Sequence, residues 1–497
     1  MQAIKMKQNN EKLLTYSYSI FLTTIIVIFF ILTSDNLFHP FIIPVYLTGI
    51  IIGFDLISWF RGEIDIFDPV GFIGIFGYHF FFLAPILQIY WETEMSYVTQ
   101  PDNWKTWVLG MGIINLFGVI IYRISRRYFD KKNYKIPILV KKWKLNTRKL
   151  IIISVPTLIV MFLLQTYIYI SFGGISGYVN SYTSGDDGFS GMGFLFTISE
   201  SFPIILLIVI VQLIKDKKYS KNTILLIFIF VLFIILKFYF GGIRGSRANT
   251  LWGIVWAAGI IHLFIKRFTR KTILLGAVGL LLFIFIYGVY KGAREDFFDI
   301  VSTETTIVEL AEESGRGIET VLLGDLSRTQ TQSYVLYRLV HYPETYDLAY
   351  GRSYLGDLAI LIPKRIYPER PPTKVKEGTE ILKGKGSYNP KGYVSSRIYG
   401  LTGEFMLNFG YIFSPLIFII LGYLISKVRL FLYTLNKQDA RLYLYPFLVV
   451  LCFLVLVQDL DNIIFNVIKN LSIPILILLF SKQSLEIDNK SYKSNLD

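Results

Sequence analysis

Residues 223–240 read TILLIFIFVLFIILKFYF, an unbroken apolar run in which Lys237 is the single charged side chain. A helix of this length crosses the hydrocarbon core of a bilayer, which is about 30 Å thick. A membrane-spanning strand would alternate apolar and polar residues, and this run does not alternate. The run therefore predicts a transmembrane helix and an α-helical membrane protein.

Runs of this kind recur along the chain. Apolar residues make up 53% of the sequence, charged residues 17%, and mean hydropathy is +0.51, whereas a soluble domain carries about 25% charged residues. We expect an all-α polytopic membrane protein with about 12 transmembrane helices. The predicted spans are 14–34, 40–58, 70–91, 105–124, 150–171, 194–214, 223–240, 250–265, 273–290, 401–425, 442–458 and 463–480.

The first apolar run follows three lysines and so has the charge pattern of a signal peptide. It lacks a small-residue cleavage site, and a second apolar run begins at Phe41. We therefore interpret it as a retained first helix. The single cysteine, Cys452, lies in an apolar segment, which excludes a disulfide framework and a cysteine-based metal site.

The basic residues that give the chain its net charge of +14 are concentrated in alternate loops. Segment 123–149 holds eleven Lys and Arg, and segments 215–221, 266–271 and 427–441 hold four each. The short loops on the opposite side carry almost none. This distribution predicts a multi-pass membrane protein with both termini in the cytoplasm, and it argues against nucleic acid as a partner.

The spans and loops divide the chain into four predicted regions: transmembrane helices 1–9 in 1–290, a large extracytoplasmic loop in 291–400, transmembrane helices 10–12 in 401–480, and a cytoplasmic tail in 481–497.

Two outward segments are longer than the others. Segment 173–193 is rich in glycine and predicts a mobile polar lid or linker. The large loop is acidic over 295–325 and basic over 364–397. It predicts amphipathic helices at 303–323 and 327–341, a short apolar stretch at 352–362 along the membrane surface, and an irregular basic segment over 371–386.

The glycine-rich stretch 241–247 carries Arg244 and Arg247 at the predicted outer membrane face. An arginine in hydrocarbon costs about 2.5–3.5 kcal/mol, so a pair needs a reason. The arginines either touch lipid headgroups or bind a diphosphate, to which guanidinium groups and a helix N-terminus are suited. We favour diphosphate binding, with Arg247 ahead of Arg244.

The large loop supplies a second set of candidates for binding diphosphate and glycan. Its arginines and lysines suit the anion, and interleaved tyrosines offer flat faces to sugar rings. The alternative is an ordinary solvated basic surface. The candidates are Arg328, Arg338, Arg352, Lys364, Arg365, Arg370 and Tyr354.

A glycosyl transfer that inverts the anomeric centre requires a general base. Glu404 lies in apolar surroundings that favour a raised pKa, and it is the first candidate. His341, which shares a predicted helix face with Arg338, is the second candidate, unless it is only an exposed loop residue.

Other polar residues have plainer explanations. Asp459-Leu460-Asp461 resembles the metal-binding Asp-x-Asp of some lipid-dependent glycosyltransferases, but we expect solvated carboxylates at a helix end. For Glu200, Lys237 and Lys469, which lie within predicted spans, we expect snorkelling or an internal ion pair. His79 and His262 are expected to be hydrogen-bonded core residues.

Two stretches, 350–371 (YGRSYLGDLAILIPKRIYPERP) and 403–410 (GEFMLNFG), resemble the O-antigen polymerase (Wzy-type) family of oligosaccharide repeat-unit polymerases. The turn Gly245-Ser246-Arg247 resembles that family as well, although Ala248 stands where glycine is frequent. The number of spans and the single large, late outward loop extend the similarity over most of the chain.

The resemblance implies an enzyme, a glycosyltransferase at the outer face of the cytoplasmic membrane. It would move a growing O-antigen or capsule glycan from undecaprenyl diphosphate onto a lipid-linked repeat unit. Arg247, with Arg352 or Arg365, would hold the diphosphate, and Glu404 would take the acceptor proton. No cofactor or metal is required, and a chain-length regulator and a flippase are expected as further partners.

Two other functions remain open. A lipid-linked glycan ligase would differ mainly in its acceptor. A transporter or flippase would need buried charged residues along a central path, which Lys237, Lys469 and Asp459 would supply.

Overall fold

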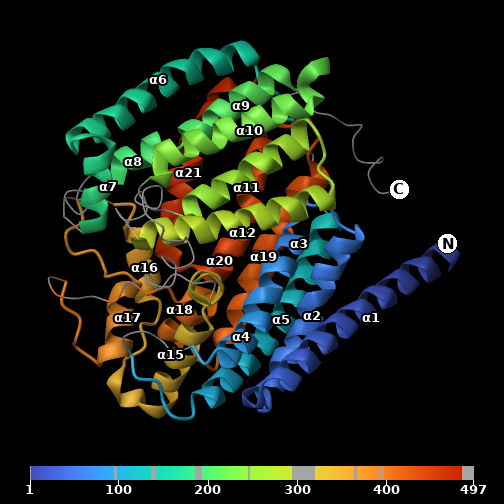
Figure 1. The fold of residues 1–497 in the computed structure, drawn as a ribbon, viewed down its shortest axis with the longest axis vertical. Coiled ribbons are helices and arrows are strands. Elements are labelled where there is room, and N and C mark those ends of the chain that lie inside the picture. The colour runs from blue at the N-terminus through green and yellow to red at the C-terminus, as the bar shows by residue number, and fades with distance from the viewer. Residues whose placement is uncertain are drawn as a thin grey trace, which may run out of the picture. The chain divides into compact units, whose positions relative to one another are not determined.

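The computed structural model describes residues 2–93, 98–135, 142–184, 193–243, 247–293, 319–362, 366–390, 392, 395 and 397–483. Within these residues the regular elements are helices, and one isolated β-bridge joins Leu145 to Lys482 (Figure 1). The predicted all-helical class is confirmed for this part of the chain.

The first twelve α-helices are α1 (Gln2–Thr33), α2 (Ile42–Arg61), α3 (Pro69–Tyr78), α4 (Ala84–Tyr90), α5 (Trp104–Lys135), α6 (Thr147–Ser171), α7 (Gly174–Ser184), α8 (Gly193–Ser199), α9 (Phe202–Ile214), α10 (Thr223–Lys237), α11 (Arg247–Phe264) and α12 (Arg270–Ala293). Further along follow α15 (Thr329–His341), α16 (Arg352–Ala359), α17 (Lys374–Lys383), α18 (Gly400–Phe409), α19 (Phe418–Thr434), α20 (Tyr445–Val457) and α21 (Leu460–Ser481). Short 3₁₀ or π turns are η1 (Asp35–Leu37), η2 (His79–Leu83), η4 (Lys218–Lys221), η5 (Phe238–Gly242), η6 (Thr320–Asp325), η7 (Pro343–Thr345), η8 (Ser414–Ile417) and η9 (Ala440–Tyr443).

In the described part of the chain, nine helices are long and apolar enough to cross a membrane, as expected of a polytopic membrane protein. Two of the predicted spans, 250–265 and 442–458, correspond to shorter apolar helices, and 273–290 lies within α12. The nine are Asn10–Thr33, Ile42–Arg61, Pro69–Tyr90, Trp104–Asn133, Thr147–Ser171, Leu195–Ile214, Thr223–Gly241, Ser414–Thr434 and Leu460–Ser481.

The predicted span 401–425 is wrong as a single helix. Helix α18 ends at Phe409, and Gly410 follows with φ of +78°, a backbone conformation that favours glycine and stops the helix. The next membrane-length helix is Ser414–Thr434. Apolar residues on both sides of Gly410 hide this break from a hydropathy pattern, so Glu404 lies in a short separate helix.

The predicted irregular segment 371–386 contains a helix, α17, which corrects the prediction. The Thr373 side chain caps this helix by accepting from the Val375 amide, 3.5 Å away. The two prolines precede the cap and so leave the helix intact. Gly378 lies inside the helix because the Tyr399 ring packs there: a Cβ would come 2.4 Å from the Tyr399 hydroxyl.

Other predicted loop segments have mixed outcomes. Segment 327–341 forms α15, which confirms that predicted helix. The apolar stretch 352–362 contains a helix, α16, which was not predicted. Most of 303–323 lies outside the described residues. Segment 173–193 begins as a helix, α7, which packs on α6 and corrects the predicted lid over Gly174–Ser184.

The basic connection predicted at 123–149 is helical as far as Lys135, because α5 continues through it. Arg123 and Arg126 lie inside this helix and donate to the Asp55 carboxylate at 2.8 and 3.2 Å. All three side chains are buried. Part of the positive charge assigned to a loop is therefore compensated within the helix bundle.

The chain divides into two compact units, each assembled from early and late segments. Unit 1 consists of Met1–Ile136, Leu322–Arg429 and Leu451–Ile464. Unit 2 consists of Pro137–Val321, Leu430–Val450 and Phe465–Asp497.

Unit 1 packs α2 against α1, α3 and α5, and Figure 1 shows these helices side by side. Gly74 allows α3 to approach closely, because a Cβ there would lie 2.5 Å from the Leu56 amide nitrogen of α2. A second core of unit 1 joins α5 to α15 and α18 through buried apolar residues, including Met111, Leu336 and Met406.

Unit 2 has its own apolar core, formed by α6, α9, α10 and α11. Trp256 is 1% exposed at its centre, and its indole nitrogen donates to the carbonyl of Tyr443 over 2.7 Å. This hydrogen bond ties α11 to η9.

Candidate functional site

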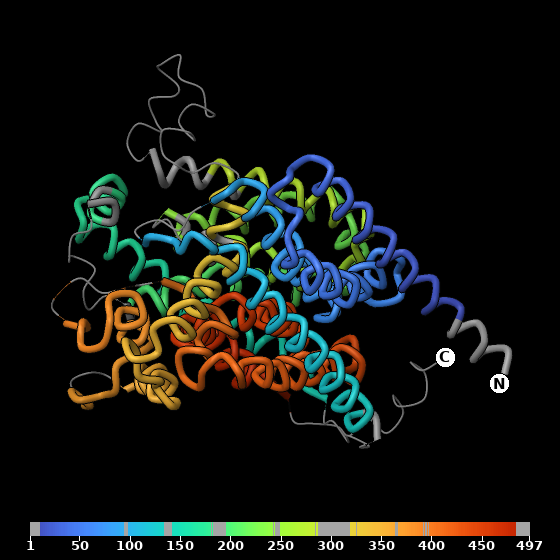
Figure 2. Tube along the Cα trace, turned by 90° about the horizontal axis from the view of Figure 1, so that it is seen from below, coloured from blue at the N-terminus to red at the C-terminus, as the bar shows by residue number. Residues whose placement is uncertain are grey.

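Five titratable residues of unit 1 lie where α16, α17, α18 and the turn between α20 and α21 come together. Helices α16–α18 form one group of short helices, which Figure 2 shows in orange. Four carboxyl groups and one lysine lie there, and we call them the acid cluster: Asp357, Glu404, Asp459, Asp461 and Lys374.

The two stretches quoted for their family resemblance, 350–371 and 403–410, pack against each other to build this site. The Asn408 amide of α18 donates to the Ser353 hydroxyl at 2.7 Å, and its oxygen accepts from the Gly351 amide at 3.0 Å. The amides of Ala349 and Tyr350 add hydrogen bonds to carbonyls at the end of α18. Asn408 thereby fixes the start of α16 against α18.

Helix α16 is also held on its other side. A Cβ at Gly356 would lie 2.2 Å from the carbonyl oxygen of Pro372, so glycine is needed for the segment before α17 to lie against α16. This close approach brings the start of α17, with Lys374, toward Asp357 on the same helix as Gly356.

Glu404 and Asp357 form a pair of carboxyl groups that share a proton. Glu404 is 3% exposed and Asp357 is fully buried. Burial raises the pKa of Asp357 to about 7, and burial with the nearby carboxylates raises the pKa of Glu404 well above its ordinary value. Neither the Asp357 oxygens nor the Oε1 of Glu404 accept a hydrogen bond from a described residue. A proton on one of these two neighbouring carboxyl groups would let it donate to the other.

Asp459 is the carboxylate of the cluster with the most donors, which favour its ionised form, whereas burial raises its pKa. Its side chain is fully buried and forms an ion pair with Lys374. Its other oxygen accepts from the backbone amides of Tyr399 and Gly400 at 2.8 and 2.7 Å. Lys374 also lies 3.4 Å from Asp461. The expectation of solvated carboxylates at a helix end is therefore wrong for Asp459.

Within the acid cluster, Asp459 serves as a fixed anion and the Glu404–Asp357 pair as the group that exchanges a proton. The lysine and two amides hold Asp459 as an anion, and that anion favours the protonated form of Glu404 nearby. The Leu460 amide donates to Glu404 at 2.9 Å and fixes its orientation. The Glu404–Asp357 pair is thus a buried group that can take up or release one proton near neutral pH, which is what general acid–base catalysis requires.

Tyr354 lies one turn before Asp357 on α16, and it is partly exposed. Burial and the carboxylates of Glu404 and Asp357 raise its pKa. Of the predicted binding residues, Tyr354 is the one that the structure places beside the acid cluster.

The predicted arginines of the large loop have protein partners. Arg352 donates to Glu377 at 2.8 and 3.1 Å, and its side chain is 39% exposed. Arg338 donates to the Ile381 carbonyl at 3.1 Å. Arg328 is buried and donates to the Val457 carbonyl at 2.9 Å. Arg328 therefore holds the start of α15 to the end of α20.

His341 and Arg370 lie nearer the surface. His341 is exposed and stacks on the Tyr337 ring at 5.6 Å, and both His341 and Arg338 contact the Tyr342 ring. Arg370 donates to the Ile362 carbonyl at 3.4 Å. Neither residue contacts the acid cluster in the hydrogen bonds and ion pairs given for the described residues.

Four predicted site residues cannot be placed with their side chains. Arg244, Lys364 and Arg365 lie outside the described residues. Helix α11 begins at Arg247, as the glycine-rich turn predicts, and the description covers only its backbone there.

Sequence reasoning missed Asp357 and Lys374. Asp357 could have been found from its spacing. It follows the predicted binding residue Tyr354 by three positions, so in a helix the two side chains share a face. Lys374 offered no such signal, since its partner Asp459 is 85 residues away in the sequence.

Unit 2 contains a second buried polar group, the lysine cluster, formed by Glu200, Lys237, Asn249 and Lys469. Lys469 forms an ion pair with Glu200, which confirms the predicted internal pair. Lys237 donates to the Asn249 oxygen at 3.1 Å, and the Asn249 amide donates to Glu200. All four side chains are at least nine-tenths buried.

The two histidines predicted to lie in the core do so. His79 shares a hydrogen bond of 2.9 Å with the Leu322 carbonyl, and His262 accepts from the Phe268 amide at 2.9 Å. In the described part of the chain, no group of three or more His, Cys, Asp or Glu side chains is placed to hold a metal ion.

Comparison of the chain with protein-family models, with curated proteins and with solved structures gives no match. The chemistry assigned to the chain therefore rests on its own side chains.

Proposed function

We propose that the chain is a glycosyltransferase that joins undecaprenyl-diphosphate-linked oligosaccharide repeat units into an O-antigen- or capsule-type polysaccharide at the outer face of the bacterial cytoplasmic membrane. The observation that carries this proposal is the Glu404–Asp357 pair, a buried proton acceptor built from the two stretches that resemble repeat-unit polymerases.

The acceptor hydroxyl oxygen forms a bond to the anomeric carbon of the growing glycan, and the bond from that carbon to the diphosphate oxygen breaks. The acceptor proton passes to the carboxyl pair, in which Glu404 is the proposed base and Asp357 is its partner. The partly exposed Tyr354 beside the pair supplies the path for that proton.

The leaving diphosphate gains negative charge as the bond breaks, and fixed cations stabilise it. Arg352 is the candidate within unit 1, with 39% of its side chain exposed beside Glu377. Arg247 begins α11 in unit 2 and remains a candidate by sequence alone. Arg244, Lys364 and Arg365 remain candidates by sequence alone.

The strongest test replaces Glu404 in a strain whose own copy is deleted. Glu404→Gln keeps the shape of the side chain and removes its acid–base chemistry. Removal of a general base costs about 100-fold to 10,000-fold in rate, so long surface glycan should be lost while lipid-linked single units still reach the outer face. Gel analysis of surface glycan, with immunoblots of membrane protein, measures both.

Glu380→Gln is the matched control, because Glu380 is a buried carboxyl of α17 outside the acid cluster. Its glycan should keep normal length. Arg247→Lys should shorten the glycan as Glu404→Gln does. Normal chain length in Glu404→Gln, at normal protein level, would refute the polymerase. Intact lipid-linked polymer in a deletion strain would instead identify a ligase.

A transporter or flippase is the second candidate, and the lysine cluster favours it. Lys237 and Lys469 lie buried in helices of membrane-spanning length, where charged residues commonly mark a transport path. For a flippase, repeat units would accumulate inside the cell in the deletion strain.

A further inference from the structure

Helix α16 has one side inside unit 1 and an opposite side that is exposed. Ser353 and Asp357 are buried, and the Ser353 hydroxyl accepts a hydrogen bond from the Asn408 amide at 2.7 Å. Leu355 and Leu358 recur at helical spacing on the other side and are 62% and 51% exposed. One short helix thus carries a member of the carboxyl pair on one side and exposed leucines on the other.

The exposed apolar residues continue past the end of α16. Four large aliphatic side chains are each at least 40% exposed, and we call them the apolar face: Leu355, Leu358, Leu361 and Ile362. Aliphatic area left in water is unfavourable, and a group of such side chains marks a surface that meets a membrane or another protein. The level of α16 along the membrane-length helices of unit 1 distinguishes these two partners.

A polar contact at the start of α5 marks one edge of the membrane-length helices of unit 1. Asn36 lies in the turn between the helices Asn10–Thr33 and Ile42–Arg61. The Lys105 ammonium, near the start of α5, donates to the Asn36 side chain at 2.9 Å. Because an ammonium group is costly in hydrocarbon, this contact indicates the level of the lipid headgroups.

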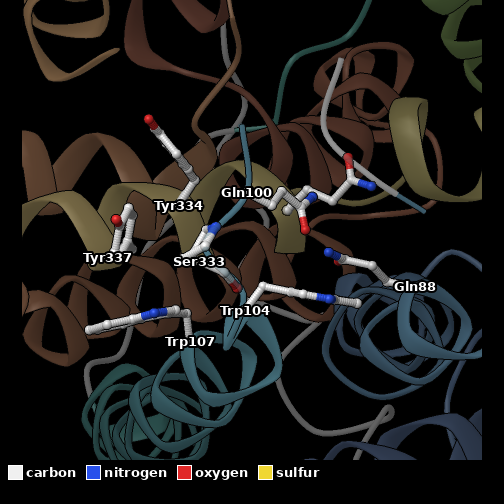
Figure 3. A pocket seen from close by; sticks show the side chains of 9 residues that line it. Gln88, Gln100, Trp104, Trp107, Ser333, Tyr334 and Tyr337 are labelled. Atoms are coloured by element: carbon white, nitrogen blue, oxygen red, sulfur yellow. The ribbon is translucent and has the colours of Figure 1, made fainter. Parts of the chain in front are cut away.

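Aromatic residues gather near the same level. Trp104 and Trp107 of α5 and Tyr334 and Tyr337 of α15 line a narrow pocket, and Figure 3 shows their rings on two sides of it. Trp107 and Tyr337 meet edge to face, with ring centroids 5.3 Å apart. Tryptophan and tyrosine are enriched where hydrocarbon meets the headgroups. The start of α5 thus has the composition of a membrane boundary.

The start of α16 lies a short distance along α5 from this boundary. The Ala349 amide, just before α16, donates to the Leu407 carbonyl of α18 at 3.1 Å. Leu407 shares a buried apolar core with Met111 of α5. Met111 follows Lys105 by six residues, which is a rise of about 9 Å along a helix. A helix in the membrane interface buries its apolar side to about this depth, 5–10 Å.

The chain beyond α18 continues from this level into the membrane. Ile412 and Phe413, which precede the membrane-length helix Ser414–Thr434, are 70% and 59% exposed. Phe418 of that helix packs on α5 at Gly118, where a Cβ would come 2.5 Å from the phenylalanine ring. Gly118 is further along α5 than Met111, so α18 and α16 lie on the boundary side of this contact.

We propose that the apolar face of α16 docks into the lipid bilayer and holds the acid cluster at the boundary between headgroups and hydrocarbon. The charges beside it fit this partner. Arg352 at the start of α16 is 39% exposed, and Ile362 is followed in the sequence by Pro363-Lys364-Arg365. Cations that flank an apolar helix face favour a surface of anionic lipids.

The docking itself does not depend on the reaction. One consequence rests on the proposed function: a repeat unit on a lipid diphosphate would reach Glu404 and Asp357 from the side, with its lipid still in the bilayer. Tyr354 is partly exposed between the two sides of α16 and would be the first residue of the site that it meets.

A spin label on the apolar face tests the docking. The full chain with a nitroxide on Leu358→Cys is placed in vesicles of phosphatidylcholine and phosphatidylglycerol. Cys452 is fully buried, so the native chain should take up no label and serves as the blank. Electron paramagnetic resonance then compares collisions of the label with oxygen, which concentrates in hydrocarbon, and with a nickel chelate, which stays in water.

Two further labelled positions calibrate the measurement. Asp102→Cys reports water, because Asp102 is exposed just before α5. Ile420→Cys reports hydrocarbon, because Ile420 is 56% exposed in the helix Ser414–Thr434. The oxygen-to-nickel collision ratio at Leu358→Cys should exceed that at Asp102→Cys by about threefold or more and approach that at Ile420→Cys. Leu355→Cys should repeat the result, and thermal melts show that each labelled chain is folded.

The docking is refuted if the labels on α16 give the ratio found at Asp102→Cys. It is also refuted if they are shielded from both reagents, which would identify a second copy of the chain or another protein as the partner. Water-exposed labels on α16 together with loss of polymer in Glu404→Gln would overturn the docking alone. Lipid-exposed labels together with normal polymer in Glu404→Gln would overturn the proposed function alone.

Discussion

The two units bury charge in opposite proportions. The acid cluster of unit 1 combines one lysine with four carboxyl groups, three of them at most 3% exposed. The lysine cluster of unit 2 combines two lysines with one glutamate and one asparagine. Buried charge that lacks a partner is lost by proton transfer or matched by a ligand.

The difference explains why chemistry is assigned to unit 1. A surplus of carboxyl groups is neutralised by proton uptake, which puts Asp357 at a pKa of about 7 and makes the cluster responsive near neutral pH. In the lysine cluster, Asn249 accepts a hydrogen bond from Lys237 and donates one to Glu200. The polar side chains there are thus joined through a neutral amide, whereas the carboxyl groups of unit 1 are neutralised by proton uptake. The acid cluster is therefore the better candidate for a catalytic site.

The largest expected effect follows from Lys374→Met. This change removes the ammonium that pairs with Asp459 and leaves a buried carboxylate with two amide donors only. Breaking such a pair costs about 3–5 kcal/mol, so the melting temperature of the purified chain should fall sharply. Lys376→Met is the control on the same helix, where the side chain is partly exposed, and it should melt as the native chain does. Equal melting of both variants would show that Asp459 needs no cation.

The pH dependence of stability gives an intermediate effect. The pKa of Asp357 is about 7 in the folded chain and about 4 when unfolded. The folded state therefore holds an extra proton between these values. Its stabilising effect is complete below about pH 4 and is lost as the pH rises through about 7, a change on the order of 4 kcal/mol.

Asp357→Asn should remove this dependence and melt at a higher temperature than the native chain at about pH 8. Melting curves over a series of pH values measure the difference between the two chains. Asp347→Asn is the control, because Asp347 is 62% exposed and pairs with Lys385 on the surface. A native chain whose stability rises over the same pH range relative to Asp357→Asn would contradict the shared proton.

The smallest effect is expected from Lys237→Met in the lysine cluster. Two lysines serve one glutamate there, so removal of Lys237 leaves the Glu200–Lys469 pair intact. The cost should be about 2 kcal/mol, for the lost hydrogen bonds to the Asn249 oxygen and the Glu200 carbonyl. Lys469→Met should be the more destabilising of the two in thermal melts. A larger loss of stability in Lys237→Met than in Lys469→Met would contradict the assignment of Lys469 as the main partner of Glu200.

Much of the architecture could be predicted from composition. The predicted run at 223–240 lies in the helix Thr223–Gly241, because a continuous apolar segment in lipid has to satisfy its backbone internally. The break at Gly410 could not be predicted in this way, since a single backbone conformation leaves no trace in hydropathy. Helix α17 was hidden for a similar reason: its Thr373 cap and its packing on Tyr399 overrode the glycine and proline content.

The candidate site was predictable only in part. The sequence predicted Glu404 from its apolar surroundings and Tyr354 as one of the loop tyrosines, and the structure places both beside Asp357. The arginines chosen for a diphosphate were selected by residue type, and Arg328 and Arg338 instead donate to backbone carbonyls. A positive charge in a sequence does not reveal whether a carbonyl or a ligand will receive its hydrogen bonds.

The sequence by itself determined the helical class, the membrane-length helices and the short helix α15, because these depend on local hydropathy and spacing. Only the tertiary structure decided which polar residues meet. Lys374 and Asp459 lie 85 positions apart and Glu404 lies 47 positions after Asp357, so their shared protons and ion pairs exist through chain folding alone. Burial then supplies the shifted pKa values, a property that no residue carries on its own.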